Sequence, residues 1–455
     1  MVSIIDERML RFVLPALAAA LIAPLPQVAS AQESAGVAAP AQGSAAARVR
    51  EAIADHAGKD LRAFYAARGN APLWLDAFDR PSDAATTLWL RMRTADRDGL
   101  DPAQFDLDQL GKLLNRSGER DPKDLARTEL ALSAAFVDYV EAMRAAPHAE
   151  MLYESPALGP APETPRAILK AAAEAPSLAD YVDAMGWMNP LYAPLRKALD
   201  DPRYSESQKQ VIETNLTRLR AIPAMPEGKH ILVDAANARL WMYEGDKPVD
   251  SMKVVVGSEK LGETPMMAGW IRWAIENPYW EVPNDITEKE LAPKVLKYGT
   301  RYLARHGYEV LADWSDDAPV VDAKTVDWQA VADGERQLHL RQLPGGENFM
   351  GKVKFEFPNP KGIYLHDTPA KQLMKEDARQ LSHGCIRMED AAKMHRWLMG
   401  EPIPTDAPAE DKVPLAEPVP IYVTYLTALP AVGGEIVFHD DPYGRDANVR
   451  LSTAE

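Results

Sequence analysis

The pattern of apolar and polar residues changes near residues 226–228, and this change constrains the fold more than any other feature. From about residue 48 to 226, alanine-rich amphipathic runs recur between Pro and Gly residues, which is typical of packed helices. After residue 228, short segments alternate apolar and polar residues and are separated by turn signals, which is typical of β-strands. The sequence therefore predicts an α+β protein, with a helical N-terminal domain followed by a mainly antiparallel β domain.

The expected β domain covers residues 227–428 and contains one long interruption. Strands are predicted at residues 230–233, 239–243, 251–256, 270–276, 337–342, 352–357, 362–365 and 419–425, with a helix from about Glu389. Residues 283–333 lie between strands and are predicted to form a helical insertion. A long excursion of this kind is often a lid or a binding loop. Residues 429–455 are expected to form a tail that packs on the outside.

The N-terminus resembles an export signal. A short basic stretch, an apolar stretch too short to span a bilayer, and an A-x-A site at Ala29-Ser30-Ala31 predict a signal peptide over residues 1–31. Residues 32–47, rich in Ala, Gly, Ser and Pro, are expected to be a flexible tether. Either Met1 or Met9 is the start of translation, and the sequence leaves this open.

The net charge of −16 argues against two classes of partner, nucleic acid and anionic lipid. A nucleic-acid binder normally presents a basic face, and anionic lipid attracts basic segments. We therefore expect no nucleic-acid partner and no tight attachment to anionic lipid.

Cys385 is the single cysteine among 455 residues, and it lies in the motif Ser382-His383-Gly384-Cys385-Ile386-Arg387. One cysteine cannot form an intramolecular disulfide, so an exported protein that retains it is expected to use the thiol. A thiolate is a strong nucleophile when an imidazole is at hand. His366 supplies that imidazole from the upstream motif Tyr364-Leu365-His366-Asp367, at the end of a predicted strand. The alternative is a buried structural cysteine with two satisfied histidines.

Two further requirements of acyl transfer can be traced in the same motifs. Gly384 permits a tight turn, so the N–H groups of Gly384 and Cys385 are predicted to converge on an oxyanion. Asp367 is expected to orient His366 through either its side chain or its backbone carbonyl, and the sequence leaves both open. His366, His383, Cys385 and Asp367 are residue types that can bind zinc, but their spacing does not match that of a zinc site. No metal and no cofactor is therefore expected.

These motifs resemble the signature of the L,D-transpeptidases with a YkuD-type catalytic domain. The resemblance extends to Ile231-Leu232-Val233-Asp234 in the first predicted strand and to Val254-Val255-Val256-Gly257 with Thr264-Pro265. The helical half resembles the scaffold domain of the large periplasmic members, as at Tyr65-Ala66-Ala67-Arg68-Gly69. The resemblance therefore covers nearly all of the chain after residue 31.

The resemblance implies a role for each residue of the two motifs. Cys385 matches the nucleophile and His366 the general base, while His383 and Gly384 match positions that shape the pocket. Arg387 is placed to orient a substrate carboxylate as a planar fork. The remaining assignments are Ser382 as a brace of the loop, Tyr364 as a pocket wall or as strand packing, and Asp367 as the partner of His366.

The resemblance also implies the reaction and its partners. The thiolate would attack a tetrapeptide stem of peptidoglycan, release D-Ala and form a thioester, which the amine of a second stem would resolve as a 3–3 cross-link. Donor and acceptor stem peptides are thus the expected partners, carbapenem β-lactams the expected inhibitors, cell-wall synthesis proteins further partners, and the periplasm the expected location.

One departure from the family leaves alternatives open. The large members carry a peptidoglycan-binding module in the scaffold domain, and no such module is recognisable between residues 190 and 216. Another cross-link type or D-amino-acid exchange is therefore an alternative reaction. If water resolves the thioester, the protein is instead an L,D-carboxypeptidase. A non-catalytic wall-binding protein is the third reading, and the presence of both His366 and Cys385 argues against it.

Overall fold

The computed structural model describes residues 43–116, 121–145, 150–224, 228–315, 317–431 and 433–448. All of them belong to one compact unit that spans Pro40–Glu455. The predicted signal peptide and most of the predicted tether lie outside the described residues. Within the tether range, a helix already begins at Ala45, because the Ser44 side chain accepts a hydrogen bond from the Ala47 N–H and so caps it.

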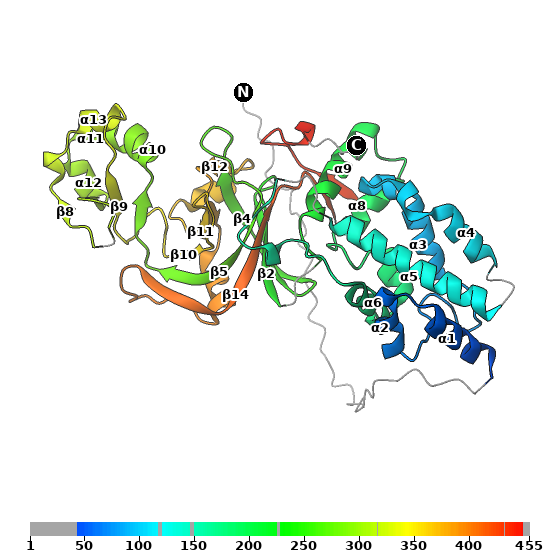
Figure 1. Ribbon diagram of the computed structural model, residues 1–455. Coiled ribbons are helices and arrows are strands. Elements are labelled where there is room, and N and C mark those ends of the chain that lie inside the picture. Colours follow the sequence, from blue (N-terminus) through cyan, green and yellow to red (C-terminus); the bar gives the residue numbers. More distant parts are fainter. Residues whose placement is uncertain are drawn as a thin grey trace, which may run out of the picture. The chain divides into compact units, whose positions relative to one another are not determined.

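The N-terminal half is helical, as the sequence predicts (Figure 1). Its helices are α1 (Ala45–His56), α2 (Lys59–Ala67), α3 (Asp83–Arg93), α4 (Leu107–Arg116), α5 (Pro122–Arg144), α6 (Pro165–Glu174), α7 (Leu178–Asp183), α8 (Tyr192–Ala198) and α9 (Glu206–Arg220), with short 3₁₀ turns at Ala95–Asp98, Pro102–Phe105 and Pro156–Leu158. Side-chain caps start several of them, and Ser205 and Gln208 form a capping box on α9.

A buried carboxylate organises the core of this helical half. Glu129 on α5 accepts hydrogen bonds from the backbone N–H groups of Leu73 and Trp74 and from the Tyr65 hydroxyl, at 2.6–2.9 Å. The indole of Trp74 also donates to Ser133, one turn further along α5. The loop after α2 is thereby tied to the longest helix, and burial raises the pKa of Glu129 despite these donors.

The second half is a mainly antiparallel sheet that closes on itself. Its strands are β1 (Leu152–Tyr153), β2 (Lys229–Asp234), β3 (Arg239–Glu244), β4 (Lys247–Gly257), β5 (Met267–Glu276), β10 (Val353–Glu356), β11 (Tyr364–His366), β12 (Gln380–Ser382), β13 (Ile386–Met388) and β14 (Asp411–Thr424). The strand order is β1-β5-β10-β11-β13-β4-β3-β2-β14, and β14 pairs with β5 as well as with β2. Figure 1 shows the long strands β5 and β14 running together.

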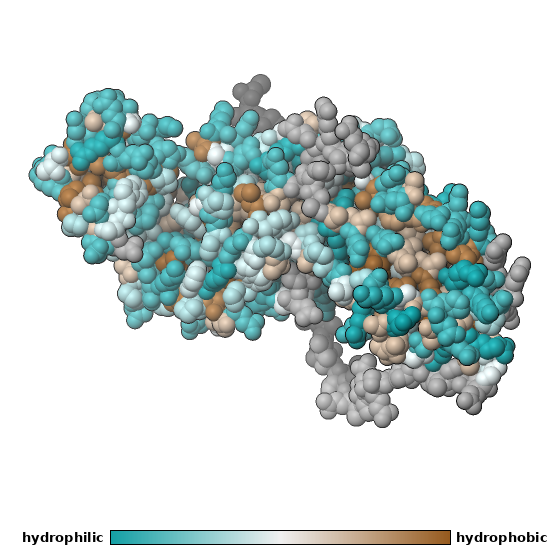
Figure 2. Space-filling view, viewed as in Figure 1, coloured by the Kyte–Doolittle hydropathy of each residue, from teal (hydrophilic) through white to brown (hydrophobic). Residues whose placement is uncertain are grey.

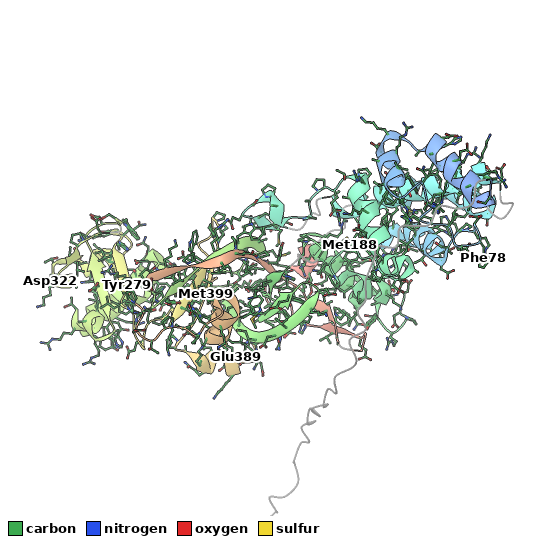
Figure 3. All side chains as sticks on the ribbon, turned by 90° about the horizontal axis from the view of Figure 1, so that it is seen from below. Phe78, Met188, Tyr279, Asp322, Glu389 and Met399 are labelled. Atoms are coloured by element: carbon green, nitrogen blue, oxygen red, sulfur yellow. The ribbon has the colours of Figure 1, made fainter. Side chains whose placement is uncertain are left out.

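Alternation along the strands gives the closed sheet an apolar interior. Leu365, Ile386 and Met388 alternate with polar neighbours and point inward, where they join a buried core with residues such as Val254 and Phe355. Helix α14 (Ala391–Met399) follows Glu389, and Figure 3 labels Glu389 and Met399 near its two ends. Met394 of this helix joins the same core. The predicted fold class is confirmed. Each predicted strand is present, although β14 begins at Asp411 rather than at residue 419, and the short strands β1, β12 and β13 were not predicted.

The insertion differs from the prediction in one respect. Besides the expected helices α10 (Asn284–Ile286), α11 (Ala292–Tyr298), α12 (Arg301–Arg305) and α13 (Trp328–Ala332), a π-helical turn at Thr287–Leu291 and a 3₁₀ turn at Ala323–Thr325, it contains strands β7 (Tyr308–Leu311) and β8 (Val320–Val321). These pair with β6 (Trp280–Val282) and β9 (His339–Gln342) in the order β6-β9-β7-β8. The flanking strands thus supply the edge on which β7 forms, and the segment has a hydrophobic core of its own.

Residues beyond 429 also differ from the predicted outer tail. Strands β15 (Ala428–Pro430) and β16 (Ile436–Phe438) form a hairpin, a 3₁₀ turn follows at Asp446–Asn448, and the Tyr443 side chain is buried. The buried Asn215 of α9 bonds both to the Thr427 N–H and to the Thr427 hydroxyl, which links the helical half to this segment. The face drawn in Figure 2 is mostly hydrophilic. Among the helices in the described part of the chain, none combines the length and the apolar character that crossing a bilayer requires.

Candidate active site

Two adjacent strands bring the predicted catalytic residues together. Strands β11 and β13 run parallel, with Leu365 opposite Ile386 and His366 opposite Arg387. Because side chains alternate between the faces of a strand, Tyr364, His366, Cys385 and Arg387 all lie on the face opposite to that of the core residues. Residues that are far apart in the sequence thus form one polar surface, on a strand pair whose other face is packed in the core.

His366 is held rigidly and is neutral at physiological pH. Its side chain is 2 % exposed, and Nδ1 lies 2.5 Å from the backbone carbonyl of Asp367. A carbonyl only accepts, so Nδ1 carries the proton and Nε2 is left with a lone pair. Burial, and then the positive charge of Arg387, lower the pKa of His366 to about 3. The ring is therefore a neutral base above that pH.

The partner that orients His366 is the backbone of Asp367, not its carboxylate. The Asp367 carboxylate instead accepts from the Lys352 N–H at 2.9 Å and from the Lys371 ammonium at 2.7 Å. Gly351 approaches this carboxylate so closely that an added Cβ would lie 2.3 Å from Oδ2. The side chain of Asp367 thus fixes the segments on either side of the histidine strand.

The thiol of Cys385 is partly exposed but largely surrounded by protein atoms. Burial raises its pKa, while the backbone and hydroxyl of Tyr364 and the charge of Arg387 act in the opposite direction. Sγ points to the carbonyl of Gly362 at 3.7 Å, and no hydrogen bond joins it to His366 within the described residues. At neutral pH both thiol and imidazole are uncharged in this arrangement.

The turn before Cys385 is braced by its own side chains. Ser382 donates to the Cys385 carbonyl at 2.7 Å and accepts from the Gly384 N–H at 3.2 Å. Gly384 has φ +115°, which favours glycine, and an added Cβ would meet Ile363 at 2.8 Å. Of the two amides predicted to converge on an oxyanion, that of Gly384 therefore already has an acceptor in Ser382.

Arg387 gives the site a positive charge, and His383 faces the insertion. Arg387 is largely buried, its Nε has no hydrogen-bond partner in the described structure, and burial lowers its pKa. A guanidinium with unused donors is suited to a planar carboxylate. His383 is partly exposed, and its Nε2 lies 3.9 Å from Glu290 in the π-helical turn of the insertion. The sequence analysis did not single out Glu290. It is one of several charged residues in the insertion, and nothing in the sequence indicates that this one lies near His383.

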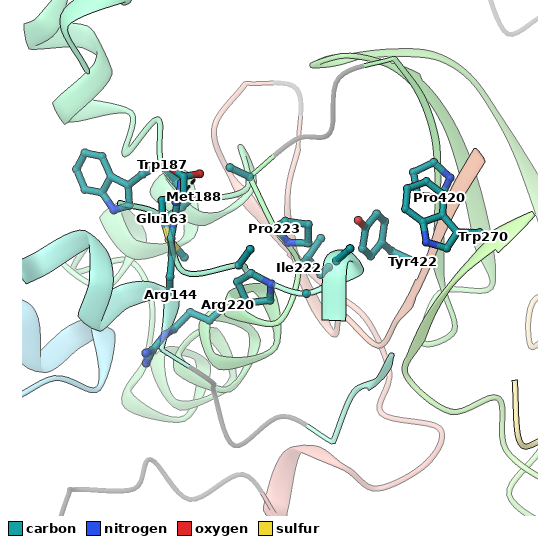
Figure 4. Close-up of a pocket in the computed structure, with 15 residues that line it drawn as sticks. Arg144, Glu163, Trp187, Met188, Arg220, Ile222, Pro223, Trp270, Pro420 and Tyr422 are labelled. Carbon is teal, nitrogen blue, oxygen red and sulfur yellow. Dashed lines mark hydrogen bonds and ion pairs between the residues drawn. The ribbon is translucent and has the colours of Figure 1, made fainter. Parts of the chain in front are cut away.

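No cluster of metal ligands marks this site in the described part of the chain. Among the described residues, no three His, Cys, Asp or Glu side chains gather as metal ligands would. The cavity drawn in Figure 4, of about 240 Å³, lies elsewhere, between Arg144, Trp187 and Arg220 of the helical half and Trp270 and Tyr422 of the sheet. Its two arginines are engaged, Arg144 with Glu163 and Arg220 with backbone carbonyls.

Comparison with known proteins gives two family matches along the chain. Residues 228–421 match the model of an L,D-transpeptidase catalytic domain of the YkuD type, and residues 59–199 match a scaffold domain. A Haemophilus influenzae protein described as "Putative L,D-transpeptidase" is 30% identical over 295 residues, or 62% of this chain. The match covers 58% of that relative's length. A solved structure described as "Structure of the Ldtfm-avibactam carbamoyl enzyme" is 13% identical, with a TM-score of 0.23, and covers 48% of this chain and 63% of that one.

Proposed function

Since this chain belongs to the L,D-transpeptidases, with a YkuD-type catalytic domain behind a scaffold domain, we propose that it cross-links peptidoglycan stem peptides through a thioester on Cys385. The observation that supports the proposal is the pairing of β11 with β13: His366 lies opposite Arg387, and Cys385 directly precedes β13. The imidazole of His366 is neutral, and Arg387 Nε has no hydrogen-bond partner in the described structure. A scaffold or binding protein has no need of this combination.

In the proposed first half-reaction, the Cys385 thiol attacks the carbonyl that precedes the terminal D-Ala of a donor stem. The sulfur–carbon bond forms as His366 Nε2 takes the thiol proton, and the same proton passes to the amine of D-Ala as the peptide bond breaks. The thiol has a single side-chain torsion, and we propose that rotation about it releases Sγ from the Gly362 carbonyl and brings it to the imidazole. Such contacts often tighten only once substrate is bound.

In the second half-reaction, the side-chain amine of an acceptor stem attacks the thioester. His366 takes a proton from that amine and returns it to the departing sulfur, which leaves a cross-link of the 3–3 type. Arg387 is proposed to hold a stem carboxylate, and Tyr364 and His383 to line the donor pocket. Because stem peptides of this kind lie outside the cytoplasm, we also propose that the protein acts in the periplasm.

The test is a mass-spectrometric assay of the purified protein with disaccharide-tetrapeptide, with Cys385→Ala as the inactive control. Dimers that lack one D-Ala support the proposal, and fragmentation places the bridge. Tripeptide without dimer indicates an L,D-carboxypeptidase. If a carbapenem acylates Cys385 but no product forms, the donor stem differs from the one proposed. If neither product nor acylation is found, the proposal is refuted.

A further inference from the structure

Two buried side chains outside the catalytic motifs hold the turn that carries Cys385. The hydroxyl of Thr264 donates to the Gly384 carbonyl at 2.7 Å and accepts from the Gly257 N–H at 2.8 Å. The hydroxyl of Tyr443 donates to the Gly257 carbonyl at 2.6 Å and accepts from the Thr264 N–H at 3.4 Å. Thr264 is fully buried and Tyr443 is 7 % exposed. Each hydroxyl therefore has both a donor and an acceptor as partner.

The contact with Gly384 fixes an atom that matters for catalysis. The carbonyl of Gly384 and the N–H of Cys385 belong to one peptide plane, and in a trans peptide they point in opposite directions. A hydrogen bond that holds this carbonyl toward Thr264 therefore holds the Cys385 N–H away from Thr264. Because the Gly384 N–H is bound to Ser382, the Cys385 N–H is the amide of this turn that remains to meet an oxyanion.

We propose that Thr264 and Tyr443 are positioning residues, which orient the Cys385 N–H for the oxyanion of the acylation step. This inference rests on the proposed function, since an oxyanion forms only if Cys385 is acylated. The positioning acts through the peptide plane of Gly384 and Cys385 and leaves the thiol itself unchanged. It assigns a catalytic consequence to Tyr443, which lies beyond residue 421, where the match to the catalytic-domain model ends.

The surroundings leave this arrangement little freedom to shift. Gly257 is packed so tightly that an added Cβ would lie 2.1 Å from the Gly262 carbonyl and 2.7 Å from the Thr264 N–H. The Ser258 N–H also donates to the Ser382 carbonyl at 3.0 Å, which links the residue after β4 to the start of the catalytic turn. A hydroxyl lost from Thr264 cannot be replaced by a neighbour without displacing backbone.

Tyr443 is itself held from the C-terminal side. Its N–H donates to the Tyr425 hydroxyl at 2.9 Å, and that hydroxyl donates to Asp441. Asp441 accepts the N–H of Asp446, and Asp446 pairs with Arg218 of α9 at 2.7 Å. A continuous series of hydrogen bonds and one ion pair thus runs from the helical half to the catalytic turn.

The experiment compares two reactions of Cys385 in the full chain. In acylation by a carbapenem, the sulfur bonds to the lactam carbonyl, the ring C–N bond breaks, and the thiol proton ends on the ring nitrogen; the carbonyl passes through an oxyanion. Alkylation by iodoacetamide displaces iodide and forms no oxyanion. Thr264→Val is expected to slow acylation by about 10- to 100-fold, somewhat less than removal of a whole oxyanion donor, while alkylation stays near the wild-type rate.

Conservative and remote variants separate positioning from stability. Thr264→Ser keeps the hydroxyl and is expected to restore most of the acylation rate. Tyr443→Phe is expected to slow acylation less than Thr264→Val, because it acts one contact further away, and it serves as the test if Thr264→Val does not fold. The control is Tyr153→Phe on strand β1, which removes a hydroxyl that donates to the Ala221 carbonyl at the same 2.6 Å but takes no part in the contacts with the catalytic turn.

Three results would overturn the inference. Equal acylation rates in wild type and Thr264→Val would show that the turn keeps its geometry without the hydroxyl. A parallel fall of acylation and alkylation would show a general disturbance of the thiol. A wild type that is alkylated but never acylated would refute the proposed function first, and the positioning role with it.

Discussion

The low pKa of His366 predicts that acylation of Cys385 continues at unusually acidic pH. The structure lowers this pKa from an ordinary value of 6.5 to about 3, first by burial and then through Arg387. In the proposed mechanism acylation requires the neutral ring, so we expect the rate to be lost only as pH falls through about 3. At pH 5, about 99 % of the rings are neutral at this pKa, against about 3 % at the ordinary one, which is about a 30-fold difference in rate.

The assay is the rate of carbapenem acylation, followed by intact-protein mass from below pH 3 up to pH 9, so that it covers the expected acid limb. Folding at each pH is checked by circular dichroism, and the remaining carbapenem is measured alongside because the drug itself decays. Arg387→Gln removes one of the two causes of the low pKa and is expected to move the acid limb to higher pH. Arg387→Lys retains the positive charge and is expected to leave the limb near that of the wild type.

Each profile is normalised to its own plateau, because Arg387 is also proposed to bind the substrate carboxylate. An acid limb of the wild type near pH 6.5 would refute the reasoning, since His366 would then behave as an exposed imidazole. A limb that stays in place in Arg387→Gln would leave burial as the whole cause.

Three further predictions concern stability. Glu129→Ala leaves the N–H groups of Leu73 and Trp74 without their acceptor and should lower the free energy of unfolding by about 3–5 kcal/mol in urea denaturation. A loss below about 1 kcal/mol would contradict the role of Glu129 in organising the helical core. Gly351→Ala, at φ +63° and against the Asp367 carboxylate, should cost about 1–3 kcal/mol in the same measurement; an unchanged midpoint would contradict the close approach. Burial raises the pKa of Asp234 to about 7, so the folded state holds a proton that the unfolded state loses near pH 4, and the wild type should lose stability as pH rises from 4 to 7. Asp234→Asn should therefore gain about 2–4 kcal/mol relative to wild type between pH 4.5 and pH 7.5, and a constant difference would argue against the raised pKa.

Local patterns were sufficient to predict much of the fold. Short β-rich segments bounded by turn residues marked β2, β3, β4 and β5, because both signals are written in consecutive residues. The insertion was predicted as helical, yet β7 forms within it. Besides the nearby β8, its partner in the sheet is β9, about thirty residues further along the chain, and no local pattern indicates that pairing.

The sequence by itself determined the chemistry: one thiol, one upstream imidazole at a strand end, and a glycine where the turn needs positive φ. These are properties of residue types and short spacings. The tertiary structure alone decided that the Asp367 carbonyl orients His366, that burial keeps thiol and imidazole neutral, and that Thr264 and Tyr443 reach the Gly384–Cys385 peptide. Burial and the direction of a backbone carbonyl depend on what packs against them, and the segments that do so here come from distant parts of the chain.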